Sequence, residues 1–200
     1  MKRLFLVILA VVISTGCFAQ FSTLDRSVDR NEWLFSLGVN SINSLGTKNP
    51  FEGLGDWGYK YPLALNIESR WTNLLAIDVG LSLNGFNEGQ RLDTSGPPER
   101  DLTYFAVDVA LKYYFGEYIL PKAEWIDFYA AAGPGLFILD NTNISLNAGG
   151  GVVFWFGRSK SYGLKAQGVG KFALNHSNSG SDYANNHFQY SLQFIIRFSK

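Results

Sequence analysis

The chain has 200 residues, enough for one domain with a sizeable core, and its 17 Lys and Arg residues balance 17 Asp and Glu residues. This balance provides no net basic charge of the kind that attracts nucleic acid, so we expect no nucleic-acid partner. Aromatic residues make up 16% of the chain, a high share for a soluble domain.

The first residues, 1–19, are predicted to be a signal peptide and not part of the fold. A basic start precedes an apolar run, and Cys17 and Ala19 provide small residues at the −3 and −1 positions of a cleavage site. Cleavage after Ala19 leaves residues 20–200 as an exported domain that contains no cysteine. The alternative is lipidation of Cys17, although Ser14 occupies the position where a lipobox has an aliphatic residue.

After the signal peptide, no apolar run approaches the roughly 20 residues that a membrane helix needs. Instead, large apolar residues alternate with polar or small ones; Phe105, Val107 and Val109, for example, alternate with Ala106 and Asp108. Such alternation predicts a β-strand with one apolar face and one polar face. The pattern predicts strands at 33–39, 61–71, 75–84, 103–115, 125–139, 145–156, 162–174 and 187–200.

Segments of this kind, most with about ten residues or more, are typical of transmembrane β-barrels, whereas strands in globular proteins usually have about five or six residues. Longer connections follow the first, third and seventh strands, and shorter ones follow the second and sixth, as in barrels with external loops and periplasmic turns. We therefore predict that residues 20–200 form an all-β, eight-stranded antiparallel up-and-down transmembrane β-barrel. The expected location is the outer membrane of a Gram-negative bacterium, with both termini in the periplasm because the strand number is even.

The soluble alternative is a lipocalin-like barrel, which has an apolar interior and a polar exterior. The polar face of this chain carries many small residues and a nearly balanced set of charges, and its apolar face is almost uncharged. That distribution favours the membrane barrel.

The polar face is predicted to line the barrel interior, which side chains fill when there are only eight strands. Because an isolated buried ion is costly, we expect these charges to form a structural network that fills the lumen. The alternative is a narrow pore for small solutes, lined by the same charges. The predicted interior network consists of Glu68, Arg70, Asp78, Asp108, Lys112, Asp127, Lys165, Lys171 and Arg197.

Little in the chain indicates catalysis. No metal-ligand spacing accompanies His176 and His187, so we expect no metal, no cofactor and no catalytic residue. The string NHSNSGSDYANN at 175–186 resembles the His-x-Ser-Asn motif of PagL-type lipid A deacylases, which are also eight-stranded barrels. However, the adjacent His176 and Ser177 would point to opposite faces of an extended strand, and Asn175 cannot act as a general base. A lipid A-modifying enzyme is thus an alternative that this spacing does not favour.

The first long connection is rich in aromatic residues, namely Phe51, Trp57, Tyr59 and Tyr61. One interpretation is a binding surface for a partner or ligand outside the cell. The interpretation we favour is an aromatic girdle at the membrane interface together with packing within the loop.

Five segments carry a family resemblance when taken in order: FSLGVNSINSLGTKNPFE, DLTYFAVDVALKYYF, DFYAAAGPGLF, SLNAGGGVVFWF and GVGKFALNHSNSGSDYANNHFQYSLQFIIRF. Together they resemble the OmpA-like eight-stranded outer-membrane β-barrels of Bacteroidota. The resemblance implies insertion into outer-membrane lipid by the barrel assembly machinery. The alternation of residues before Phe198 is similar to the C-terminal signal that this machinery recognises. Many relatives carry a C-terminal peptidoglycan-binding domain, which we do not expect here because the chain stops two residues after Phe198. The expected function is structural, or that of an envelope partner acting through the external loops.

Overall fold

The computed structural model describes residues 32–43, 50–51, 53–92, 96–139, 141–156, 160–174 and 186–198. The predicted signal peptide and the adjacent pair His176 and Ser177 lie outside these residues. No helix within the described ranges combines the length and apolarity needed to cross a bilayer.

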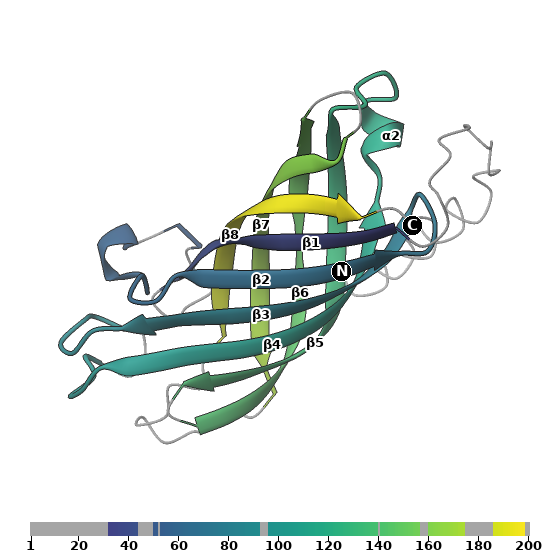
Figure 1. Cartoon of the computed structure of the whole chain (residues 1–200). Coiled ribbons are helices and arrows are strands. Elements are labelled where there is room, and N and C mark those ends of the chain that lie inside the picture. Colours follow the sequence, from purple (N-terminus) through teal and green to yellow (C-terminus); the bar gives the residue numbers. More distant parts are fainter. Residues whose placement is uncertain are drawn as a thin grey trace, which may run out of the picture.

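Antiparallel strands form one closed barrel, in which each strand pairs with its neighbours in sequence and β8 pairs with β1 (Figure 1). The last strand closes the barrel against the first, and the register places Trp33 opposite Phe198. The predicted eight-stranded all-β barrel is therefore confirmed. The strands are β1 (Glu32–Ile42), β2 (Leu63–Arg70), β3 (Leu75–Phe86), β4 (Leu102–Tyr114), β5 (Ile126–Leu139), β6 (Asn141–Phe156), β7 (Tyr162–Ala173) and β8 (His187–Phe198).

The two ends of the barrel differ. At the terminal end, β1 begins, β8 ends, and the connections after β2, β4 and β6 are found, including the short helix α2 (Gly116–Ile119), which the sequence pattern did not predict. At the loop end lie the connections after β1, β3, β5 and β7, including the 3-10 turn η1 (Leu54–Asp56). Figure 1 shows α2 and the β1–β2 connection at opposite ends. Three loop-end connections are long, as predicted, but only residue 140 separates β5 from β6.

The strand β6 begins at Asn141, four residues earlier than the sequence pattern predicted. The first residues of β6 are polar, so hydrophobic alternation cannot reveal them. Backbone pairing does not require apolar side chains, and Asn141 and Asn143 pair with Leu139 and Phe137 of β5. The Asn143 amide also donates a hydrogen bond to the Asn141 carbonyl at 3.1 Å. The β5–β6 hairpin is longer because its ladder continues through polar sequence.

Side chains alternate between the lumen and the exterior as the sequence pattern predicted. On β4, Tyr104 and Lys112 face inward and are fully buried, whereas Phe105, Val109 and Leu111 face outward and are exposed. The other strands show the same alternation. Ile126 is an exception, because its place in the alternation of β5 is on the outward face and yet it is buried.

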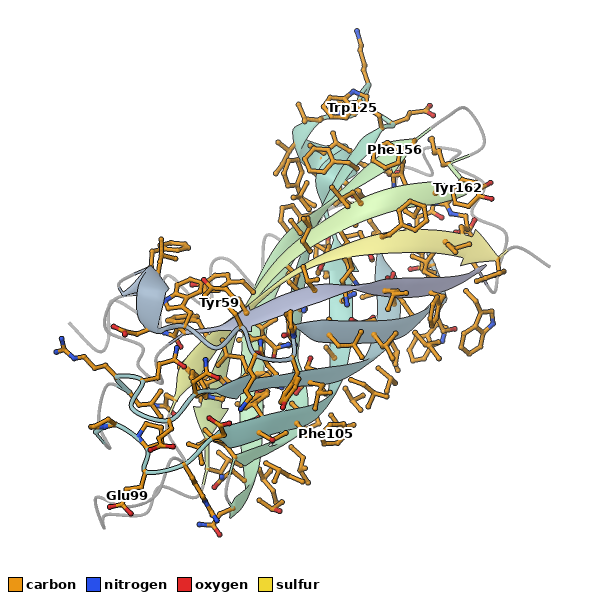
Figure 2. All side chains as sticks on the ribbon, turned by 60° about the vertical axis from the view of Figure 1, so that its left-hand side comes forward. Tyr59, Glu99, Phe105, Trp125, Phe156 and Tyr162 are labelled. Carbon is orange, nitrogen blue, oxygen red and sulfur yellow. The ribbon has the colours of Figure 1, made fainter. Side chains whose placement is uncertain are left out.

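On the outward face of β4, an aliphatic middle lies between two aromatic bands, whereas β8 places Phe194 beside Leu37 of β1. On β4 the two bands are marked by Tyr113 and Phe105, with Val109 between them. Their eight-residue separation corresponds to roughly 20 Å along the barrel axis when strands tilt by about 40°. Figure 2 shows Trp125, Phe156 and Tyr162 near the terminal end and Tyr59 near the loop end.

Candidate functional site

Glu68 on β2 is the centre of a buried ionic network in the lumen, nearer the terminal end. Its carboxylate accepts hydrogen bonds from Lys112 Nζ at 2.8 Å, from the Tyr114 hydroxyl at 2.6 Å and from Arg70 Nε at 3.2 Å. All four side chains are buried. A buried carboxylate is stable only when hydrogen-bond donors replace the water that it loses on burial. These three hydrogen bonds therefore stabilise the Glu68 carboxylate inside the lumen.

The network continues around the lumen through Asp78 on β3. Lys112 Nζ lies 3.2 Å from Asp78 Oδ1, and the Asn66 amide donates to Asp78 Oδ2 at 2.6 Å. The Gln193 amide on β8 in turn donates to Asn66 Oδ1 at 2.6 Å. Strands that are not neighbours are thus joined through their inward side chains. We call this set the Glu68 network: Asn66, Glu68, Arg70, Asp78, Lys112, Tyr114 and Gln193.

Planar cations stack on aromatic rings at the terminal end of the lumen. The guanidinium of Arg70 lies 3.9 Å from the centre of the Tyr114 ring, and that of Arg197 lies 4.2 Å from the Trp155 ring. Arg197 Nε is also 3.6 Å from Glu32 Oε2. Cation–π contacts of this kind strengthen as water is excluded, so the buried Arg70 gains more from its ring than the partly exposed Arg197 does.

Asp127 and Lys165 are two further members of the predicted interior set that lie near the Glu68 network. Asp127 Oδ2 lies 4.0 Å from Arg70 Nη2, the limit of an ion pair. Lys165 is buried on β7 opposite Gln193, but its Nζ has no hydrogen-bond partner within the described part of the chain. Lys165 thus belongs to the predicted interior set but has no hydrogen bond to its other members.

Asp108 forms a second polar cluster, nearer the loop end. Its carboxylate accepts hydrogen bonds from Lys171 Nζ at 2.6 Å and from the Asn147 amide at 2.7 Å. The Ser145 hydroxyl donates to Asn147 Oδ1 at 2.8 Å. The structure thus brings together Asp108 and Lys171, the two remaining members of the predicted interior set.

An apolar layer fills the lumen at the loop end. His187 is buried beside it: its ring meets the Phe137 ring edge-on with centres 4.8 Å apart, and its Nε2 lies 2.9 Å from the Tyr104 hydroxyl. Leu92 reaches this layer from the connection after β3, and the other members are inward residues of the strands. We call it the apolar cap: Ile42, Phe86, Leu92, Leu102, Tyr104, Ala106, Phe137, Leu139 and Ala173.

Sequence reasoning missed Glu32 and considered His187 only as a candidate metal ligand. Glu32 was missed because the first strand was predicted to begin one residue later, although it stands two positions before the inward Leu34. His187 likewise stands two positions before Gln189, and the period of two already assigns it to the lumen. With Glu32 included, the described strands carry five inward acidic residues, which equals the number of inward basic residues in the predicted set.

The ionisable side chains of the interior contact mainly one another. Within the described residues, no group of three or more His, Cys, Asp or Glu side chains is placed to hold a metal ion. Both Glu68 oxygens accept hydrogen bonds from buried donors, so neither is directed at a site where a substrate could lie.

No family model matches the sequence, and no curated protein matches it. Among solved structures, the crystal structure of Neisserial surface protein A aligns with a TM-score of 0.51 at 14% identity, covering 85% of this chain and 96% of that one. The solid-state NMR structure of outer membrane protein AlkL in DMPC lipid bilayers aligns with a TM-score of 0.52 at 14% identity, covering 86% and 92%. The chain has the fold of a small outer-membrane β-barrel. Ail, the attachment invasion locus protein of Yersinia pestis, aligns with a lower TM-score of 0.48 at 16% identity, covering 84% and 99%. At these identities the likeness concerns the fold alone.

Proposed function

We propose that this protein is a non-enzymatic, integral outer-membrane β-barrel with a structural role or a role as a partner in an envelope assembly. Insertion is supported by the exposed apolar outward face, which on β4 has an aliphatic middle between the aromatic residues Tyr113 and Phe105. Their separation of roughly 20 Å is close to the apolar band, about 25 Å tall, of outer-membrane barrels. The even strand number supports periplasmic termini, and the segments resembling Bacteroidota OmpA-like barrels support insertion by the barrel assembly machinery.

The observation that carries a structural role is the filled lumen. The Glu68 network and the apolar cap occupy successive levels of the interior, and all their residues are buried except Asn66, which is half-buried. A pore for small solutes requires a continuous hydrated path, and a layer of packed apolar side chains interrupts such a path. We therefore favour a closed barrel over the pore.

Conductance measurement in planar lipid bilayers tests this proposal. Folding is first verified by the change in gel mobility between unboiled and boiled samples. We expect folded protein to add no stable current steps over the lipid alone, because both layers block the lumen. Reproducible single-channel steps from folded protein would instead support the pore.

The partner role is tested separately, by photocrosslinking in cells from Glu99, an exposed loop-end residue (Figure 2). A photoreactive residue at Glu99 should capture an envelope protein if the external loops bind one. The matched control places the same group at Leu37, which faces outward in the middle of the barrel wall. Capture from neither position would leave the structural role without a partner.

A further inference from the structure

The connection after β1 folds back against the outside of the barrel. Tyr190 faces outward on β8, and the Trp57 ring stacks on it with centres 5.1 Å apart and planes 9° apart. The Phe51 ring stacks on the same Tyr190 ring at 5.5 Å, and the Tyr190 hydroxyl donates to the Pro50 carbonyl at 2.9 Å. We call the described residues of this connection, 50–51 and 53–62, loop 1.

Hydrogen bonds from the barrel rim and the next loop hold loop 1 in this position. The Gly58 amide donates to the Ile42 carbonyl at 2.8 Å, and the Gln90 side-chain amide donates to the Trp57 carbonyl at 2.7 Å. Lys60 also donates a hydrogen bond to the Asp101 carboxylate, before β4. Loop 1 is therefore held both by the end of β1, at Ile42, and by the connection between β3 and β4, at Gln90 and Asp101.

The exposure of the aromatic and aliphatic residues of loop 1 falls into two groups. Trp57 is only 6% exposed, since it is packed on Tyr190. Phe51, Leu54 and Tyr59 are 71%, 59% and 50% exposed. Phe51 and Tyr59 each stack on one ring, of Tyr190 and of Trp57, and these contacts leave at least half of each residue uncovered. Such a cluster of exposed large apolar residues indicates an interaction surface.

We propose that the exposed tip of loop 1, comprising Phe51, Leu54 and Tyr59, inserts into the outer leaflet and binds the acyl chains of its lipids. This inference rests on the proposed membrane insertion of the barrel. The occupant is assigned by continuity: the loop lies on the outer wall, and the exposed apolar face of β2 continues directly from it. Asp56 at the end of η1 limits the depth to the interfacial region, because a carboxylate in the hydrocarbon core is costly.

Fluorescence quenching by lipids brominated on their acyl chains tests the proposal. In a Cys17→Ser background, which has no other cysteine, single Leu54→Cys, Leu37→Cys and Glu99→Cys variants carry a small fluorophore. Leu37 reports the middle of the barrel wall and Glu99 a second loop, and all three residues are surface-exposed. Folding is confirmed by gel mobility before each vesicle measurement.

We expect brominated phospholipid vesicles to quench the labels at Leu37 and Leu54 at least twofold and to leave the label at Glu99 unchanged. Quenching at Leu37 without quenching at Leu54 would overturn the loop 1 proposal and leave membrane insertion intact. If lipid does not quench the Leu54 label, but an added second envelope protein shields that label from solvent, the loop 1 proposal is overturned in favour of a protein partner. An unquenched Leu37 label in folded protein would contradict membrane insertion itself.

Discussion

The change Glu68→Gln removes the central charge of the Glu68 network while preserving the size of the side chain. Arg70 and Tyr114 lose their charged acceptor at 3.2 Å and 2.6 Å, and both remain buried. Removing one partner of a buried ion pair costs about 3–5 kcal/mol. Because Asp78 stays 3.2 Å from Lys112, we expect the lower value. A loss of about 3 kcal/mol in the free energy of unfolding lowers the folding equilibrium constant by roughly 150-fold.

The measurement is urea unfolding of the refolded barrel in detergent micelles, followed by tryptophan fluorescence. The matched control is Glu124→Gln, which removes an exposed ion pair in which Glu124 Oε2 lies 2.6 Å from Lys160 Nζ. Exposed pairs contribute about 0–1 kcal/mol, so the control should change little. If Glu68→Gln lowers the free energy of unfolding by no more than the control does, the network does not stabilise the barrel and our reasoning is refuted.

Three further changes probe separate features. Lys165→Met removes a buried ammonium that has no hydrogen-bond partner among the described residues, so the free energy of unfolding in urea should stay constant or rise by about 1 kcal/mol, and a fall would reveal a stabilising contact. Gly149→Ala should abolish the gel mobility shift of the folded barrel, because the new Cβ would clash with the backbone oxygen of Gly168; Gly55→Ala, with nothing within 4 Å, should retain the shift. The hydrogen bond from Lys60 lowers the pKa of Asp101, so its stabilising contribution is complete above about 3.9, the unfolded-state value, and is lost as pH falls through the lower folded pKa. Asp101→Asn should remove that small acid-dependent loss, measured by loop proteolysis between roughly pH 5 and pH 2 with an acid-active protease, and an unchanged profile would contradict it.

The two-faced strands could be predicted because one physical cause acts along their whole length. Outward residues meet a different environment from inward ones, so Phe105 and Asp108 are assigned to opposite faces by parity alone. The same rule extends to Glu32 once the start of β1 is known. The strand boundaries were less predictable, since the ladder at Asn141 depends on backbone pairing and not on hydrophobicity.

Parity does not determine which inward charges meet. Lys112 and Lys165 are both lysines on the polar face, yet Lys112 contacts Glu68 and Asp78, whereas Lys165 Nζ has no hydrogen-bond partner within the described residues. The difference arises from the stagger of strands around the closed barrel, which sets the height of each side chain in the lumen.

The path of loop 1 was equally inaccessible to sequence reasoning. It depends on Trp57 meeting Tyr190, a residue of the last strand. The sequence shows that this loop is rich in aromatic residues, but it could not show that Trp57 would be covered while Leu54 remains exposed. That distinction requires the closed barrel, because only closure places β8 beside β1 and beneath the loop.

We also predict that the Glu68 network and the apolar cap block the lumen independently of each other, because they lie in series along it. Phe137→Ala opens the apolar cap, and the paired change of Glu68 and Lys112 to Ala opens the Glu68 network without leaving either partner's charge behind. In planar bilayers, each change alone should remain silent, since the other layer still blocks the path, and their combination should produce current steps. Phe to Ala in a core costs about 3–5 kcal/mol, so gel mobility must first show folded barrel. Current from Phe137→Ala alone would mean that the polar network is permeable and the cap is the only barrier. Silence from the folded triple variant would mean that other side chains close the lumen.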